Sequence, residues 1–127
     1  MKGPILGIFL PSHFLLIGVL LCMTTRAQPA IEWETSLGGL QMDNSVRMAL
    51  CTDGGNIALC RTASTNGIAI GNHGGYDLLV VKLDATGALE WSRCLGGTGN
   101  EYPGAVQQTT DGGFILAATT NSTDGDV

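Results

Sequence analysis

The chain repeats its own sequence at one constant spacing, and this repeat limits the folds open to it more than any other feature. Trp33 recurs as Trp91, and Thr52-Asp53-Gly54-Gly55 recurs as Thr110-Asp111-Gly112-Gly113. The two copies align without a gap, and about a third of the aligned positions are identical. A repeat of this length is typical of stacked or ring-arranged structural modules. Because the second copy stops partway, we expect the chain to be part of a larger array.

Hydrophobic alternation and turn residues within one period predict four short antiparallel strands. We expect these strands at residues 31–37, 46–51, 56–62 and 76–83, with a polar, glycine-rich loop over 64–75. Between the second and third strands, Asp53-Gly54-Gly55 is typical of a hairpin turn, because glycine accepts positive φ without strain. The second period predicts strands at 91–95, 105–109 and 114–120. No helical pattern is evident after residue 27.

Four strands in sequential hairpins are the content of one β-propeller blade. The nearly continuous apolar run Leu78-Leu79-Val80-Val81 indicates an inner strand that is covered on both faces. The sequence therefore predicts an all-β fold of antiparallel four-stranded propeller blades. We expect a first repeat over 28–90 and a truncated second repeat over 91–127, about one and a half blades in all. Closed propellers use about four to eight blades, so we expect an N-terminal fragment of a larger protein.

The segment 1–27 has the composition of a secretory signal peptide. A positive start at Met1-Lys2 precedes an apolar stretch that runs from Ile5 to about Met23. Thr25 and Ala27 are small residues at the −3 and −1 positions that a signal peptidase requires, which predicts cleavage before Gln28. An uncleaved membrane anchor and a lipoprotein attached through Cys22 are the alternatives. With cleavage, we expect a secreted or cell-surface protein without a stable membrane span.

After residue 27 the chain is strongly acidic, with four basic and eleven acidic side chains and hence a net charge of 4 − 11 = −7. Such a chain repels phosphate backbones, so we expect no nucleic-acid partner. Three cysteines remain, Cys51, Cys60 and Cys94. An oxidising compartment would permit pairing, but the second copy has Thr109 and Ala118 in place of the first two. We therefore interpret all three as small buried apolar residues, with their pairing left open.

The period resembles a repeat of secreted and cell-surface bacterial proteins. The residues that carry the resemblance are Trp33, Gly38-Gly39, Thr52 to Ile57, Thr62, Ser64, Gly67, Gly75, Asp77, Val80 to Asp84, Gly87 and Trp91. Together they are similar to propeller-type repeats that often carry a C-terminal type IX secretion sorting domain. The pattern departs at Asn56, where an aromatic such as Phe114 is usual, and at 67–70, which replaces the Asp-Gly-Asp segment kept at 124–126. The resemblance implies export and a propeller, and it implies no single chemistry.

For several residues the sequence allows a structural role and a functional one. Trp33 and Trp91 recur at equivalent positions, which favours packing between units over ligand stacking. Asp124 and Asp126 are weak candidates for calcium ligands, because their loop offers several oxygen ligands. That loop lacks the spacing of a twelve-residue calcium loop, and Asp also favours turns through local backbone bonds. We therefore expect turn chemistry, with no metal and no cofactor.

The sequence shows no catalytic constellation. His73 is the only histidine after residue 27, and its glycine-rich surroundings indicate a solvated loop. Lys82 lies within an apolar strand, where we expect a structural ion pair with Asp77, Asp84 or an acid of the adjoining unit. The Gly-Gly pairs lack the Lys-Ser/Thr ending and the helix of a phosphate loop.

These features predict an exported or cell-surface repeat protein that acts in binding, adhesion or scaffolding, with a protein or carbohydrate ligand. The alternative is a propeller enzyme, or the accessory domain of a longer secreted enzyme whose active site lies elsewhere. A third interpretation is a complete small β domain that oligomerises.

Overall fold

In a computed structural model, the structure describes residues 29–127, which form six β-strands and no helix. The strands are β1 Asp43–Leu50, β2 Asn56–Thr62, β3 Asp77–Leu83, β4 Leu89–Leu95, β5 Glu101–Gln108 and β6 Phe114–Thr120. The predicted all-β, antiparallel fold is confirmed. The predicted signal peptide over residues 1–27 lies outside the described residues.

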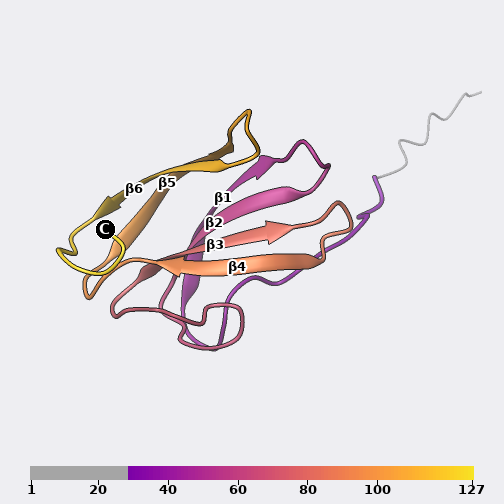
Figure 1. The fold of residues 1–127 in the computed structure, drawn as a ribbon. Coiled ribbons are helices and arrows are strands. Elements are labelled where there is room, and N and C mark those ends of the chain that lie inside the picture. Colours follow the sequence, from indigo (N-terminus) through magenta and orange to yellow (C-terminus); the bar gives the residue numbers. More distant parts are fainter. Residues whose placement is uncertain (1–28) are drawn as a thin grey trace, which may run out of the picture. The chain divides into compact units, whose positions relative to one another are not determined.

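The strands form two antiparallel sheets. The first has four strands in the order β1-β2-β3-β4, so each strand pairs with its neighbour in sequence, and the second is the hairpin β5-β6. Figure 1 shows the hairpin as a second layer over one face of the first sheet. Within residues 29–127 the sheets stack but close no ring, so the propeller arrangement itself stays a prediction.

The sequence repeat is also a structural repeat. Both bounds of β5 and β6 follow those of β1 and β2 at the same spacing that separates Trp33 from Trp91. The two hairpins share their register, since Leu50 pairs with Asn56 as Gln108 pairs with Phe114. Their turns also match: Cys51 N donates to Gly55 O at 2.8 Å, and the equivalent bond in the second copy is 2.9 Å. The first glycine of each turn lies at φ 82° and 87° respectively, a backbone conformation that favours glycine.

One predicted strand is wrong. Residues 31–37 form no strand, although their counterpart in the second copy is β4. A strand needs a partner whose backbone groups are free to pair. By the repeat, the partner of this segment would be a strand of the β3 type, and β3 itself already pairs with β2 on one side and β4 on the other. The first sheet includes β4 and ends at Leu95, beyond the repeat boundary that we expect at residue 90.

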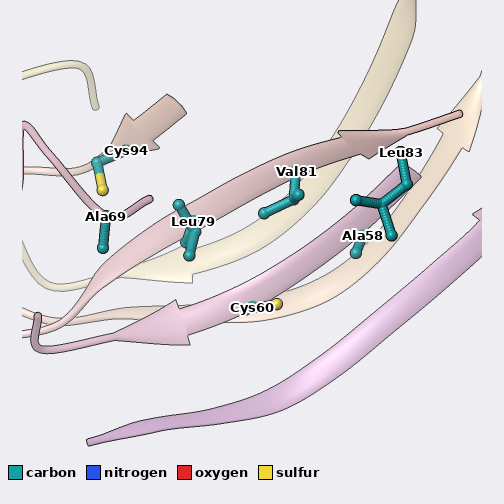
Figure 2. Packing of buried hydrophobic residues seen from close by; sticks show 7 residues of the cluster. All are labelled: Ala58, Cys60, Ala69, Leu79, Val81, Leu83 and Cys94. Carbon is teal, nitrogen blue, oxygen red and sulfur yellow. The ribbon is translucent and has the colours of Figure 1, made fainter. Parts of the chain in front are cut away.

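The two inner strands of the first sheet, β2 and β3, are buried on both faces. Ala58, Cys60, Leu79, Val81, Leu83 and Cys94 form one apolar cluster together with Ala69 from the loop after β2. Figure 2 shows these side chains along the strands that carry them. Cys51, Ile57, Leu59, Leu78 and Val80 form a second cluster. All seven residues of β3 are buried, which explains the continuous apolar run in this strand. Each fully buried aliphatic side chain contributes about 1.5–3 kcal/mol relative to exposure.

Different segments cover the two clusters. Val106, Phe114 and Leu116 of the hairpin β5-β6 pack on the second cluster. Trp33 and Leu37 pack on the first cluster from the N-terminal segment, which runs along the side of the sheet away from the hairpin (Figure 1). The ring of Trp33 lies so close to Gly87 that a Cβ at this glycine would overlap it. The segment 31–37 thus packs on the sheet without joining it.

Candidate functional site

The main polar cluster lies where the loops before β3 and β5 meet. Asp77 and Glu101 are the first residues of these two strands, and both are fully buried. Asp77 Oδ2 accepts a hydrogen bond from the backbone N–H of His73 at 2.9 Å, and it lies 2.8 Å from His73 Nδ1. The two strands are joined at this point, because Glu101 N donates to Tyr76 O at 2.7 Å.

Gly96 allows the two carboxylates to approach each other. A Cβ at this position would lie 2.5 Å from Glu101 Oε2 and 2.8 Å from Asp77 Oδ1. Both carboxylates therefore reach the same backbone point from different sheets, and no larger residue fits there. Asp77 Oδ1 is buried and has no hydrogen-bond partner in the described part of the chain. This oxygen is an acceptor that the described residues leave unused.

Glu101 also belongs to a clamp that the repeat builds twice. Its carboxylate accepts hydrogen bonds from Thr120 Oγ1 at 2.7 Å and from Ser122 Oγ at 2.6 Å. The counterpart of Glu101 in the first copy is Asp43, whose carboxylate accepts hydrogen bonds from Ser64 Oγ at 3.3 Å and from Gly39 N at 2.9 Å. In each copy an acidic residue at the start of the first strand thus holds the loop that follows the second. This repetition indicates a structural role.

The two calcium candidates take part in loop contacts. Asp124 Oδ1 accepts a hydrogen bond from Thr98 N at 2.8 Å, and its counterpart Asn66 accepts one from Leu40 N at 2.9 Å. The hydrogen bonds from Thr98 lower the pKa of Asp124. The side chain of Asp126 is more loosely held, with one oxygen 4.0 Å from His73 Nε2 and the other 4.0 Å from an Arg93 nitrogen, while its backbone N–H donates to Gly96 O at 2.9 Å. Residues 29–127 contain no group of three or more His, Cys, Asp or Glu placed to hold a metal ion, and calcium at Asp124 and Asp126 stays a prediction.

His73 forms an acid–imidazole pair. The hydrogen bond with Asp77 raises its pKa, and burial opposes this shift only in part. The ring remains partly open to solvent, with 39% of the side chain exposed. Its polar contacts in the described residues are with Asp77 and Asp126, and none is with a hydroxyl or a thiol. The pair can bind or release a proton, but the structure places no nucleophile against it.

Lys82 forms a structural ion pair, but its partners are neither Asp77 nor Asp84. Its ammonium lies 2.8 Å from Asp53 Oδ2 and 2.7 Å from Glu90 Oε2, and only 4% of its side chain is exposed. Burial disfavours the charge, but the hydrogen bonds with both acids outweigh burial and raise the pKa of Lys82. The prediction of Asp77 or Asp84 as its partner is wrong.

Register explains why these two acids are not available to Lys82. Asp77 begins β3, near the opposite end of the strand from Lys82, and its side chain bonds with His73. Asp84 follows β3 directly and holds its own turn, where it accepts hydrogen bonds from Thr86 N and Ala88 N at 2.8 and 3.0 Å. The acids that pair with Lys82 come instead from the turn between β1 and β2 (Asp53) and from β4 (Glu90).

A cation–π sandwich was not predicted from the sequence. The guanidinium of Arg61 in β2 lies 3.7 Å from the ring centroid of Tyr76 and 4.2 Å from that of Tyr102. Tyr102 belongs to the second sheet, so the sandwich links the two sheets. The counterparts of Arg61 and Tyr102 are Thr119 and Asn44, and the repeat therefore offered no signal for it. Tyrosine stacking on a flat cation is also a way to bind ligands, but Arg61 occupies this place.

The cysteines and tryptophans have packing roles in the structure. Cys51, Cys60 and Cys94 are buried and unpaired, and burial raises the pKa of Cys60 and of Cys94 to about 11. Trp91 packs edge-to-face on Phe114, with ring centroids 5.8 Å apart. It lines a groove of about 210 Å³ between the two sheets, together with Val80, Arg93, Leu95, Phe114 and Leu116.

Comparisons with protein-family models, with curated proteins and with solved structures give no match to this chain. In addition, no helix within residues 29–127 has the length and apolarity needed to cross a bilayer.

Proposed function

We propose that this chain is part of an exported or cell-surface β-propeller repeat protein that acts as a non-catalytic binding, adhesion or scaffold module. The observation that supports this most is the second hairpin, which copies the first in register and packs face to face on the first sheet. Stacking of equivalent units is how repeat proteins build an extended core. Such a core leaves the loops at its ends free to bind a partner.

The loop end that carries His73 is the candidate binding surface. Loops 63–76, 96–100 and 121–127 gather there and are joined by backbone hydrogen bonds, among them Asn121 N to Asn100 O at 3.2 Å. The clamps described above hold these loops in place, and preorganised loops bind with a smaller entropic cost. Exposed polar groups dominate this end, which suits a protein or carbohydrate ligand and, given the net charge, not a nucleic acid.

Binding is tested with the chain from Gln28 onward on arrays of glycans and of extracellular proteins. A Thr123→Lys/Asp126→Lys variant changes two exposed residues at the candidate end. A Thr110→Lys variant changes an exposed residue at the opposite end and serves as the control. We expect a ligand that the wild type and the control bind and the double variant loses. Equal binding by all three proteins would contradict the assignment of the surface.

Export is tested by sequencing the N-terminus of the protein recovered outside the cytoplasm. We expect Gln28 as the first residue, because the small side chains of Thr25 and Ala27 meet the requirement of signal peptidase. Ala27→Arg places a large charged residue at the −1 position and should block this cleavage. An intact Met1 or a lipid-modified Cys22 at the N-terminus of the wild type would contradict the proposal.

The alternative is an enzyme, and one observation favours it. His73 and the buried Asp77 are paired at the candidate loop end, with Glu101 close by. Such a pair is part of many hydrolytic sites, in which a third group completes it. A panel of ester, peptide and glycoside substrates tests this alternative. Turnover by the wild type that His73→Ala abolishes would favour the enzyme over the binding module.

A further inference from the structure

The contact between the two sheets shows how one repeat unit packs on the next, and the same kind of contact can be sought at the remaining exposed faces. On the first sheet, Ile57 and Leu59 are fully buried beneath the hairpin β5-β6. On the hairpin, Val106 and Leu116 supply the covering surface. Each repeat unit therefore has one face that is covered by the next unit and one face that covers the previous unit. The chain makes this contact once.

A face of the covered kind is open on the hairpin. Ile115 and Ala117 are the repeat counterparts of Ile57 and Leu59, yet Ile115 is 61% exposed where Ile57 is 0% exposed. Ala105 and Gln107 pair with these two residues across the hairpin. The four hairpin residues, which we call the Ile115 face, line a shallow depression of about 140 Å³. The residue at this repeat position is thus buried in the first copy and exposed in the second.

A face of the covering kind is open along β1 of the first sheet, although Ala58 beside it is buried. The counterpart of Val106 is Met48, which is 51% exposed. Met48 and Leu50 pair with Ala58 and Asn56, the counterparts of the covering residues Leu116 and Phe114. Val46, Met48 and Leu50 are all exposed along β1, and we call them the Met48 face. Ordinarily, monomeric proteins expose few contiguous apolar patches of this kind.

The N-terminal segment packs on the side of the sheet where a preceding unit would lie by analogy with the contact of the hairpin. Residues 31–37 are the repeat counterpart of β4, and Trp33 packs on the first sheet as Trp91 of β4 packs on Phe114 of the second. The segment takes the place of the fourth strand of a preceding unit. The surface that the first two strands of such a unit would cover includes the Met48 face, and it is empty among the described residues.

We propose that the Ile115 face of one copy of this chain binds the Met48 face of a second copy, head to tail. Neither face contains a charged residue, so association desolvates no ion. The two faces differ, so the contact is heterologous and each dimer keeps one open face of each kind. Such a contact extends into longer assemblies unless the rotation between copies closes a ring. This inference rests on the structural repeat and concerns residues 28–127 on their own, because in a longer repeat protein the preceding and following units would cover the same two faces.

The test is sedimentation velocity over a wide concentration range, with the chain from Gln28 onward, which includes all of the compact unit Ile31–Val127. We expect the wild type to form dimers and longer species as its concentration rises. Met48→Asp blocks one face and Ile115→Asp blocks the other, so each variant alone should sediment as a monomer. A mixture of the two should form dimers and nothing longer, because one intact face of each kind remains.

Controls separate this contact from misfolding and from symmetric association. Both substituted side chains are exposed, and thermal unfolding should confirm that each variant remains folded. Leu40→Asp changes an exposed residue outside both faces and should assemble as the wild type does. A monomeric wild type would overturn the proposal. Two further results would also overturn it: a mixture that stays monomeric, and assembly that only one of the two variants abolishes.

Discussion

Acidic residues at or near strand ends accept hydrogen bonds that hold the loops and turns of the described chain. Asp43 and Glu101 differ by one methylene group and hold equivalent loops. Asp77 holds the loop of His73, and Asp53 holds its own hairpin turn, where it accepts a hydrogen bond from the N–H of the second turn glycine at 2.8 Å. Carboxylates suit these places because loop backbones present unpaired N–H donors. The acidic composition is therefore explained in part by loop structure.

Titration of His73 tests the contact with Asp77. The pKa of His73 should lie above 6.5, because the hydrogen bond with Asp77 favours the charged imidazole. A folded-state pKa above the unfolded value means that the stabilisation is fully present below about pH 6.5 and is lost as the pH rises through the folded-state pKa. NMR follows the ring directly, since His73 is the only histidine after residue 27.

Asp77→Asn is the matched variant for this titration. It keeps the shape of the side chain and removes its charge, so the pKa of His73 should fall toward 6.5. A midpoint at or below this value in the wild type, or one that Asp77→Asn leaves unchanged, would contradict the contact.

Removing the charge of Lys82 should lower the stability of the protein less than removing the charges of its two partners. Lys82→Met removes a buried cation, and its exposed partners Asp53 and Glu90 can then be hydrated. Asp53→Asn/Glu90→Gln leaves a buried cation without a counter-charge, which is the costlier case. Urea unfolding should show a larger loss of stability for the double variant. Equal losses, or a larger loss for Lys82→Met, would count against the buried ion pair.

At the scale of the strands, the same local sequence has different energetic roles in the two copies. The residues at 56–62 form a strand with a partner on each side, whereas β6 pairs on one side only. Most residues of β2 are buried, and most residues of β6 are exposed. Tertiary surroundings, and not the repeat itself, set what each strand contributes to stability.

Equivalent isoleucines measure this difference between the copies. Ile57→Ala removes a fully buried side chain and should lower the free energy of unfolding by about 2–5 kcal/mol. Ile115→Ala changes an exposed side chain at the equivalent position, and its effect should stay within about 0.5 kcal/mol. Urea unfolding of the two variants, at concentrations where the chain is monomeric, gives both values. Similar losses for both variants would show that the copies are equally buried.

At the scale of the whole molecule, stability is concentrated in the first sheet. β3 is one of the two inner strands of that sheet, all seven of its residues are buried, and it contributes side chains to the apolar clusters on both faces. The hairpin β5-β6 is held through one apolar face, through Arg61, through the bond between Thr52 N and Gln108 Oε1 at 2.8 Å, and through the bond between Glu101 N and Tyr76 O at 2.7 Å. The molecule should therefore loosen from its C-terminal side.

Amide hydrogen exchange tests this order of opening. We expect the slowest exchange in β2 and β3 and faster exchange in β6, because β6 has one free edge and no fully buried residue. Exchange resolved by mass spectrometry on peptides from each strand gives the comparison. Protection of β6 equal to that of β3 in the monomer would show that the second unit is as fully covered as the first.

Local patterns predicted the strands well where the causes are local. The bounds of β2 and β6 agree with the sequence prediction, because alternation and the Asp-Gly-Gly turn act within a short stretch of chain. The starts of β1 and β5 are predicted too late, at 46 instead of 43 and at 105 instead of 101, and the missed part of β5 contains Pro103 and Gly104, which are uncommon within strands. A register shift between Pro103 and Ala105 accommodates them, and only the partner strand makes this visible.

By itself, the sequence determined the all-β class, the repeat that relates Trp33 to Trp91 and the burial of the three cysteines, because these depend on composition and short-range pattern. The tertiary structure decided the partners. It left 31–37 outside the sheet, although β4 has the same pattern, and it gave Lys82 two acids from neighbouring hairpins. It also placed Arg61 between two tyrosines. Pairing of this kind depends on which strand edges are free and which side chains meet across sheets, and neither property is encoded within one segment.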